Sequence, residues 1–118
     1  KRKVYLCHGC PWDNLNGYVY PNDSFDGFLG LRHTIFMLGH THYPMDGRIA
    51  KIRIINPGSC GQPRDCNSAS FAIFDFKTEK LQFKRAHYNV GALIKDVLRN
   101  QEDNPYLVDV LKRKRNCK

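Results

Sequence analysis

Two histidines separated by one residue follow a short apolar run, and this arrangement constrains the fold more than any other part of the sequence. Residues 34–38 have the apolar and aromatic composition of a buried strand, and Gly39-His40-Thr41-His42 follows directly. Residues two apart diverge in a helix, whereas both imidazoles can face one concave site where a strand ends. Neutral imidazole is the commonest protein ligand of divalent transition metals. The stretch therefore predicts a strand that delivers two metal ligands to a loop.

Two further segments of this kind end in residues that suit a binding site. The apolar residues 4–7 lead to His8-Gly9, and the isoleucine-rich residues 49–55 lead to Asn56-Pro57-Gly58-Ser59. If the three strands lie side by side, the loops at their shared ends converge, as they do in open α/β sheets. We therefore expect three imidazoles to meet at one site: His8, His40 and His42.

The residues next to these histidines have expected roles that are mainly structural. Asn56 is expected to hold its turn through side-chain to backbone hydrogen bonds. Gly39 and Gly58 are expected to be structural residues of the site, and Gly58 to let the backbone approach the site closely. Ser59 is a candidate phosphate ligand, although capping the turn is the more frequent role of such a serine. Beyond the metal ligands, we expect no catalytic side chain in this sequence.

For each of the other candidate binding residues, a structural role is the alternative to ligand binding. Arg64 is a candidate bidentate phosphate ligand, but a loop arginine in this context is usually paired with a neighbour such as Asp65. Trp12, Tyr18 and Tyr20 suit a pocket for a base or an aromatic leaving group, while anchoring the loop is the commoner use of such residues.

The rest of the sequence predicts a mixed α/β fold in a single domain over residues 1–118, with C-terminal helices and a basic tail in residues 89–118. Asn89 is a suitable N-cap, and apolar residues then recur at helical spacing. The other expected elements are a loop at 11–21, a short helical segment at 25–31, a turn at 45–48, antiparallel strands at 70–76 and 81–88, and helices at 90–98 and 104–111.

The formal charge of +8 does not by itself indicate a nucleic-acid-binding protein, because eight basic residues lie at the two ends of the chain. We expect nucleic acid only as a substrate. No apolar stretch is long enough to cross a bilayer, and the apolar run near the N-terminus is too short for a signal peptide, so we expect a cytoplasmic protein without a membrane partner.

The five cysteines are an odd number in a chain without an export signal, which favours reduced thiols. A minor alternative is a zinc-stabilised nucleic-acid module built from four of them: Cys7, Cys10, Cys60 and Cys66. Against that module, Cys7 belongs to an apolar strand, and no second Cys-x-x-Cys pair exists.

Taken together, the motifs resemble the C-terminal half of a calcineurin-like metallophosphoesterase of the small bacterial and archaeal phosphodiesterase branch. The last three motifs of that branch are His-Gly, Gly-His-x-His and Asn-Pro-Gly-Ser, and here they stand in this order at residues 8–9, 39–42 and 56–59. The resemblance covers residues 4–88 and includes the flanking residues 43–45 and 61–65.

This resemblance implies a β-sandwich flanked by helices, with two divalent metal ions at its site. His8 and His40 would bind one ion and His42 the other. A water or hydroxide shared by the metals would attack phosphorus in a phosphodiester or phosphomonoester. We expect manganese first, with iron, zinc, nickel and cobalt as the alternatives.

The sequence also departs from the family pattern. None of its nine glycines is followed by Asp or Asn, and no Asp is followed two residues later by His. The Asp-x-His, Gly-Asp-x-x-Asp and Gly-Asn-His motifs of the family are therefore missing. We expect a fragment that is inactive alone. Its expected partner is the missing N-terminal half of the domain, and a homodimer is a further possibility. The alternative is a non-catalytic scaffold that binds proteins on the same fold.

Overall fold

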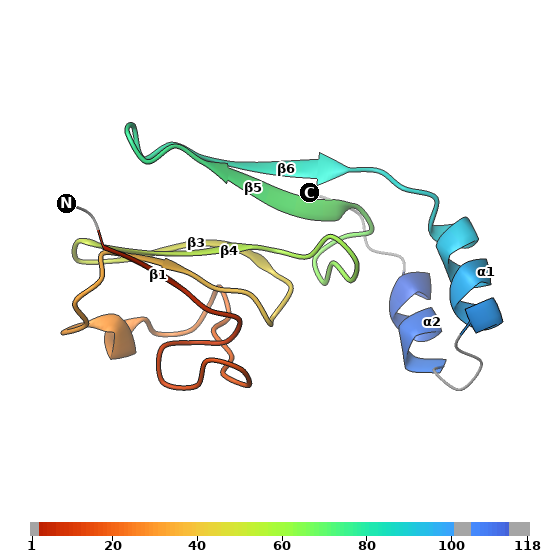
Figure 1. Cartoon of the computed structure of the whole chain (residues 1–118), viewed down its shortest axis with the longest axis horizontal. Coiled ribbons are helices and arrows are strands. Elements are labelled where there is room, and N and C mark those ends of the chain that lie inside the picture. Colours follow the sequence, from red (N-terminus) through yellow and green to blue (C-terminus); the bar gives the residue numbers. More distant parts are fainter. Residues whose placement is uncertain (1–2, 101–104, 114–118) are drawn as a thin grey trace.

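The computed structural model describes residues 3–100 and 105–113, which form two β-sheets and two α-helices (Figure 1). The larger sheet has four strands in the order β1-β2-β4-β3. Their bounds are Val4–Leu6 for β1, Ile35–Met37 for β2, Ile52–Pro57 for β4 and Pro44–Ile49 for β3. The first three strands are parallel, and β3 is antiparallel to β4. The loops that follow β1, β2 and β4 therefore leave the sheet at the same edge.

The core lies on one face of this sheet and is built from side chains that alternate along the strands. Phe36 of β2 and Ile54 of β4 are fully buried on this face. A 3₁₀ turn, η1 (Asp26–Phe28), adds Phe28, whose ring centroid lies 5.0 Å from that of Phe36. Because the aromatic rings meet edge to face, they fill the core without a flat stack.

The second sheet consists of the antiparallel strands β5 (Ala69–Phe74) and β6 (Leu81–Ala86). It lies over the opposite face of the four-stranded sheet, as Figure 1 shows. Apolar side chains from both sheets line the space between them: Leu6, Met37, Leu38, Ile55, Phe74 and Leu81. The mixed α/β fold is therefore confirmed, with two facing sheets.

Two helices, α1 (Val90–Asn100) and α2 (Pro105–Lys112), lie beyond the end of the sheets (Figure 1). The side chain of Asn89 caps α1 by accepting a 2.9 Å hydrogen bond from the backbone N–H of Ala92, as the sequence predicts. Neither helix in the described parts of the chain is both long and apolar enough to cross a bilayer.

Two local predictions are wrong. The expected turn at 45–48 lies inside β3, and the chain reverses instead around Ala50, which has a φ of 50°. Packing requires glycine at position 47, because a Cβ there would come within 2.6 Å of the Phe25 ring. The expected helical segment at 25–31 is only the three-residue η1, and the chain turns away at Gly30, which has a φ of 86°.

The cysteines correct another expectation. Cys7, Cys10 and Cys60 are free, but Cys66 is disulfide-bonded, so the prediction of reduced thiols is wrong for that residue. An odd number of cysteines rules out complete pairing and does not rule out a single bond. A disulfide sulfur is not available as a thiolate, which overturns the four-cysteine zinc alternative. Partial burial, with a smaller contribution from Cys10, raises the pKa of the Cys7 thiol, which therefore stays protonated at neutral pH.

Candidate functional site

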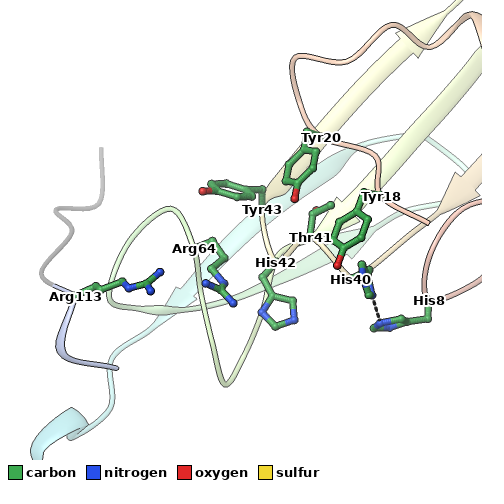
Figure 2. A pocket seen from close by; sticks show the side chains of 9 residues that line it. All are labelled: His8, Tyr18, Tyr20, His40, Thr41, His42, Tyr43, Arg64 and Arg113. Carbon is green, nitrogen blue, oxygen red and sulfur yellow. Dashed lines mark hydrogen bonds between the residues drawn. The ribbon is translucent and has the colours of Figure 1, made fainter. Parts of the chain in front are cut away.

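An open pocket of about 570 Å³ lies at the edge of the sheet where β1 and β2 end (Figure 2). It is lined by nine residues: His8, Tyr18, Tyr20, His40, Thr41, His42, Tyr43, Arg64 and Arg113. Within the described residues, this lining contains imidazole, guanidinium and phenol groups and no carboxylate. Such a pocket suits an anionic ligand or a metal ion.

The parallel pairing of β1 and β2 brings His8 and His40 together. The backbone N–H of Gly39 donates a 2.9 Å hydrogen bond to the carbonyl of His8, and a Cβ on Gly39 would lie only 3.3 Å from that oxygen. The two rings are 4.7 Å apart and nearly perpendicular, and His40 Nδ1 is 2.6 Å from His8 Nε2 (Figure 2). The two ring nitrogens are therefore hydrogen-bonded to each other.

His42 lines the same pocket but stands apart from this pair. Its Nδ1 lies 2.9 Å from the carbonyl oxygen of Gln62, and because a carbonyl can only accept, Nδ1 carries the proton. The neutral ring therefore keeps its lone pair on Nε2. Among the described residues, no three His, Cys, Asp or Glu side chains form a group that could hold one metal ion. The three predicted histidines share a pocket without forming a single three-ligand set.

The loop that carries His40 and His42 has an unusual backbone. Both histidines have a φ of 62°, in the left-handed region that few residues other than glycine adopt. Thr41 lies between them with its side chain buried. The fully buried Asn56 of β4 holds this loop, since its Nδ2 donates to the Gly39 carbonyl at 2.7 Å and to Thr41 Oγ1 at 3.1 Å. Strand β4 thus fixes the loop that follows β2.

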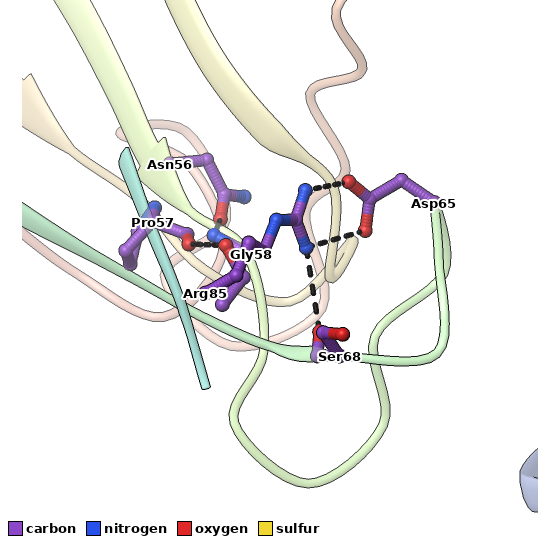
Figure 3. A network of polar contacts seen from close by, with 7 residues as sticks. Asn56, Pro57, Gly58, Asp65, Ser68 and Arg85 are labelled. Atoms are coloured by element: carbon purple, nitrogen blue, oxygen red, sulfur yellow. Dashed lines mark hydrogen bonds and ion pairs between the residues drawn. The ribbon is translucent and has the colours of Figure 1, made fainter. Parts of the chain in front are cut away.

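Gly58 and Ser59 of the Asn-Pro-Gly-Ser motif follow the end of β4, and Figure 3 shows Gly58 beside Asn56 and Pro57. Asn56 Oδ1 accepts a 3.0 Å hydrogen bond from the backbone N–H of Gly58. Gly58 has a φ of 84°, and a Cβ there would lie 2.7 Å from Ser70 Oγ, so the position needs glycine. Ser59 Oγ accepts a 2.9 Å hydrogen bond from the backbone N–H of Gln62. This places Ser59 at the turn, and it is not among the described residues that line the pocket.

The structure separates Arg64 from its sequence neighbour. Asp65 forms an ion pair with Arg85, which also donates to the carbonyl of Ser68 (Figure 3). The alternative in which Asp65 neutralises Arg64 is therefore wrong. Arg64 Nη2 instead donates a 2.5 Å hydrogen bond to the hydroxyl of Tyr106 on α2, and this bond lowers the pKa of Tyr106. Arg64 therefore lines the pocket without a carboxylate partner among the described residues.

Arg113 is a pocket residue that sequence reasoning missed. It belongs to the basic tail expected at the C-terminus, to which the sequence assigns no binding residue. The residue reaches the pocket because α2 ends beside the loop that carries Arg64, as Figure 2 shows. No local pattern signals this position, since it depends on how α2 docks.

Residues 1–79, two thirds of the chain, match the sequence model of the calcineurin-like phosphoesterase superfamily domain. The chain belongs to that superfamily. An uncharacterized protein of Methanocaldococcus jannaschii is similar in sequence: it is 32% identical over 121 residues, which cover 85% of this chain and 47% of that protein.

Two solved structures are similar in fold to this superfamily member. A metallophosphoesterase from Sphaerobacter thermophilus has a TM-score of 0.77 and 25% identity, over 94% of this chain and 56% of that one. A hypothetical protein from Pyrococcus horikoshii has a TM-score of 0.77 and 21% identity, over 92% of this chain and 45% of that one. The chain thus spans about half the length of these relatives.

Proposed function

We propose that this chain supplies His8, His40 and His42 to the dinuclear metal site of a phosphoesterase that hydrolyses phosphodiester or phosphomonoester bonds. The observation that carries the proposal is the convergence of histidines from two separate strand ends on one pocket that also holds two arginines. Satisfied structural histidines have no reason to gather in this way, whereas metal ligands must.

The donor atoms of the pocket fit divalent transition metals. His8 Nε2 and His40 Nδ1 lie 2.6 Å apart and would hold one ion in place of the hydrogen bond between them, while His42 would bind the second through Nε2. Metal-binding histidines usually donate their other ring N–H to a carbonyl or carboxylate, which fixes the ring, and the bond from His42 Nδ1 to the Gln62 carbonyl is of this kind. Manganese is the ion we propose first, with iron, cobalt, nickel and zinc as alternatives. Two bound cations would acidify a water for attack on phosphorus and neutralise charge on the oxygens.

The pocket of this chain is incomplete as a two-metal site. Three neutral imidazoles leave the four positive charges of two divalent ions unbalanced, and no carboxylate is among the described residues that line the pocket. We therefore propose that carboxylate ligands come from polypeptide other than these 118 residues, and that these residues alone do not catalyse hydrolysis. The half-length coverage of the relatives supports this division.

Arg64 and Arg113 would hold the phosphate. Neither guanidinium forms an ion pair within residues 3–100 and 105–113, and both line the pocket. Tyr106 positions Arg64 through its hydroxyl and through its ring, which lies 5.8 Å from the guanidinium carbon. A planar guanidinium group can donate two parallel hydrogen bonds to two phosphate oxygens, so these side chains would orient the ester before reaction.

The metal-site assignment is tested by isothermal titration calorimetry, in which manganese is titrated into a polypeptide that joins these residues to the missing carboxylate motifs. We expect His8→Ala, His40→Ala and His42→Ala each to weaken binding by about 100-fold or more, because a lost ligand costs at least as much as a lost hydrogen-bond partner of a ligand. His87→Ala is the control, since His87 is exposed and lies outside the pocket lining. Equal affinities for His40→Ala and His87→Ala would contradict the assignment.

The activity is tested in a polypeptide that joins these residues to the missing carboxylate motifs. With manganese present it should hydrolyse a generic phosphodiester such as bis(p-nitrophenyl) phosphate, and His40→Ala should abolish turnover. An inactive polypeptide that also binds no manganese would favour the non-catalytic scaffold.

A further inference from the structure

Tyrosines form one wall of the pocket. Figure 2 shows Tyr18 and Tyr20 on the side away from the arginines, with Tyr43 nearer to Arg64. The rings of Tyr18 and Tyr20 are 5.9 Å apart and nearly parallel, with an angle of 9° between them. Tyr18 also meets His40 edge to face, at a centroid distance of 4.2 Å. The aromatic wall therefore begins directly beside the proposed metal ligands.

Anchoring of the loop does not explain these tyrosines. Val19 is buried in the core, and because side chains alternate along an extended segment, Tyr18 and Tyr20 point the other way. They remain 56% and 40% exposed. Trp12 on the other side of the loop is exposed as well, but its ring packs against the buried Phe28 at a centroid distance of 5.1 Å. Val19 and Trp12 hold the loop, and the two tyrosines are left to face the pocket.

The loop that presents the tyrosines is tightly packed. A Cβ on Gly17 would come within 2.1 Å of Cys10 Sγ, so no other residue fits there. The backbone N–H of Cys10 donates to the carbonyl of Asp13 at 2.9 Å, and that of Tyr20 donates to Asp23 Oδ2 at 2.7 Å. The wall is therefore formed before any ligand binds, which lowers the entropic cost of binding.

The phenol groups of the wall are not used elsewhere. Within residues 3–100 and 105–113, the hydroxyls of Tyr18, Tyr20 and Tyr43 make no hydrogen bond. Tyr18 and Tyr20 are exposed, so their hydroxyls are available to a ligand that displaces water from the pocket. Exposed aromatic surface and hydroxyls without a partner among the described residues together suit a flat ligand that carries polar atoms on its edge.

We propose that the pocket recognises phosphate esters that carry a planar aromatic group, a nucleobase or an aryl ring, with this group against Tyr18 and Tyr20 and the phosphate between the histidines and the arginines. The proposal deepens the proposed function and rests on it for the position of the phosphate. Stacking on tyrosine is strong enough to set such a preference and is tolerant of the ring's identity.

The test compares ligands that share a phosphate and differ in the ring. Dissociation constants of AMP, ribose 5-phosphate, phenyl phosphate and methyl phosphate are measured by NMR titration of the chain at millimolar ligand. We expect AMP to bind about tenfold more tightly than ribose 5-phosphate, because stacking of one base is worth that much. A gain for AMP alone assigns a nucleobase, and a gain for phenyl phosphate as well assigns any planar ring; both support the proposal.

Variants separate stacking from general damage. Tyr18→Leu should remove most of the AMP preference while ribose 5-phosphate binds as before, and Tyr18→Phe should keep it. Phe83→Leu is the matched control and should keep the preference, because Phe83 is an exposed aromatic residue of β6 that does not line the pocket. Equal binding of AMP and ribose 5-phosphate, an unchanged preference in Tyr18→Leu, or no binding of AMP would overturn the proposal. Failure of the proposed function shows separately, as manganese binding that does not depend on the histidines.

Discussion

Replacing Asn56 by alanine should destabilise the chain by about 3 kcal/mol, since three hydrogen bonds of about 1 kcal/mol each would be lost. The Asn56 side chain is fully buried and bonds to the Gly39 carbonyl, to Thr41 Oγ1 and to the backbone N–H of Gly58. Thr41 is itself only 5% exposed, so water cannot easily replace the lost partner. Against a typical total of about 5–15 kcal/mol, this loss is large.

Urea denaturation followed by circular dichroism measures the effect. A loss of about 3 kcal/mol corresponds to a fall of about 1.5–2 M in the urea midpoint with an unchanged slope. Asn16→Ala is the matched control, because Asn16 is exposed and its side chain makes no hydrogen bond to any described residue; its stability should change by less than about 0.5 kcal/mol. If Asn56→Ala and Asn16→Ala denature at the same midpoint, the reasoning about the buried amide is refuted.

Two further substitutions test the turn at Gly58 and the ion pair between Asp46 of β3 and the buried Arg53 of β4. Gly58→Ala should cost about 2 kcal/mol or more, because its φ is 84° and its Cβ would meet Ser70, whereas Gly61→Ala has open space and should be near neutral; equal melting temperatures would contradict this. Asp46→Ala should cost about 2 kcal/mol by leaving the buried Arg53 unpaired, while Asp96→Ala, in an exposed pair, should cost less than about 0.5 kcal/mol in the same denaturation assay, and a reversed order would refute the comparison.

The convergence of the histidines could be predicted from sequence because it follows from local rules. Apolar runs of strand length that end in His8 and His40 imply parallel neighbours, and parallel neighbours share an edge. The turn expected at 45–48 failed because Gly47 serves a contact with Phe25, which is distant in sequence. Arg113 was missed for the same reason, since only the docking of α2 brings it to the pocket.

The left-handed backbone of the Gly-His-Thr-His loop restricts how this site can diverge. At a φ of 62°, the residues best tolerated in place of His40 and His42 are glycine, asparagine and aspartate. Two of these three carry oxygen donors, which favour harder cations such as magnesium or calcium over the transition metals. If the proposed metal site is present, substitution at these two positions would change which ion is preferred before it disturbs the fold, whereas substitution at the buried Thr41 would affect folding first.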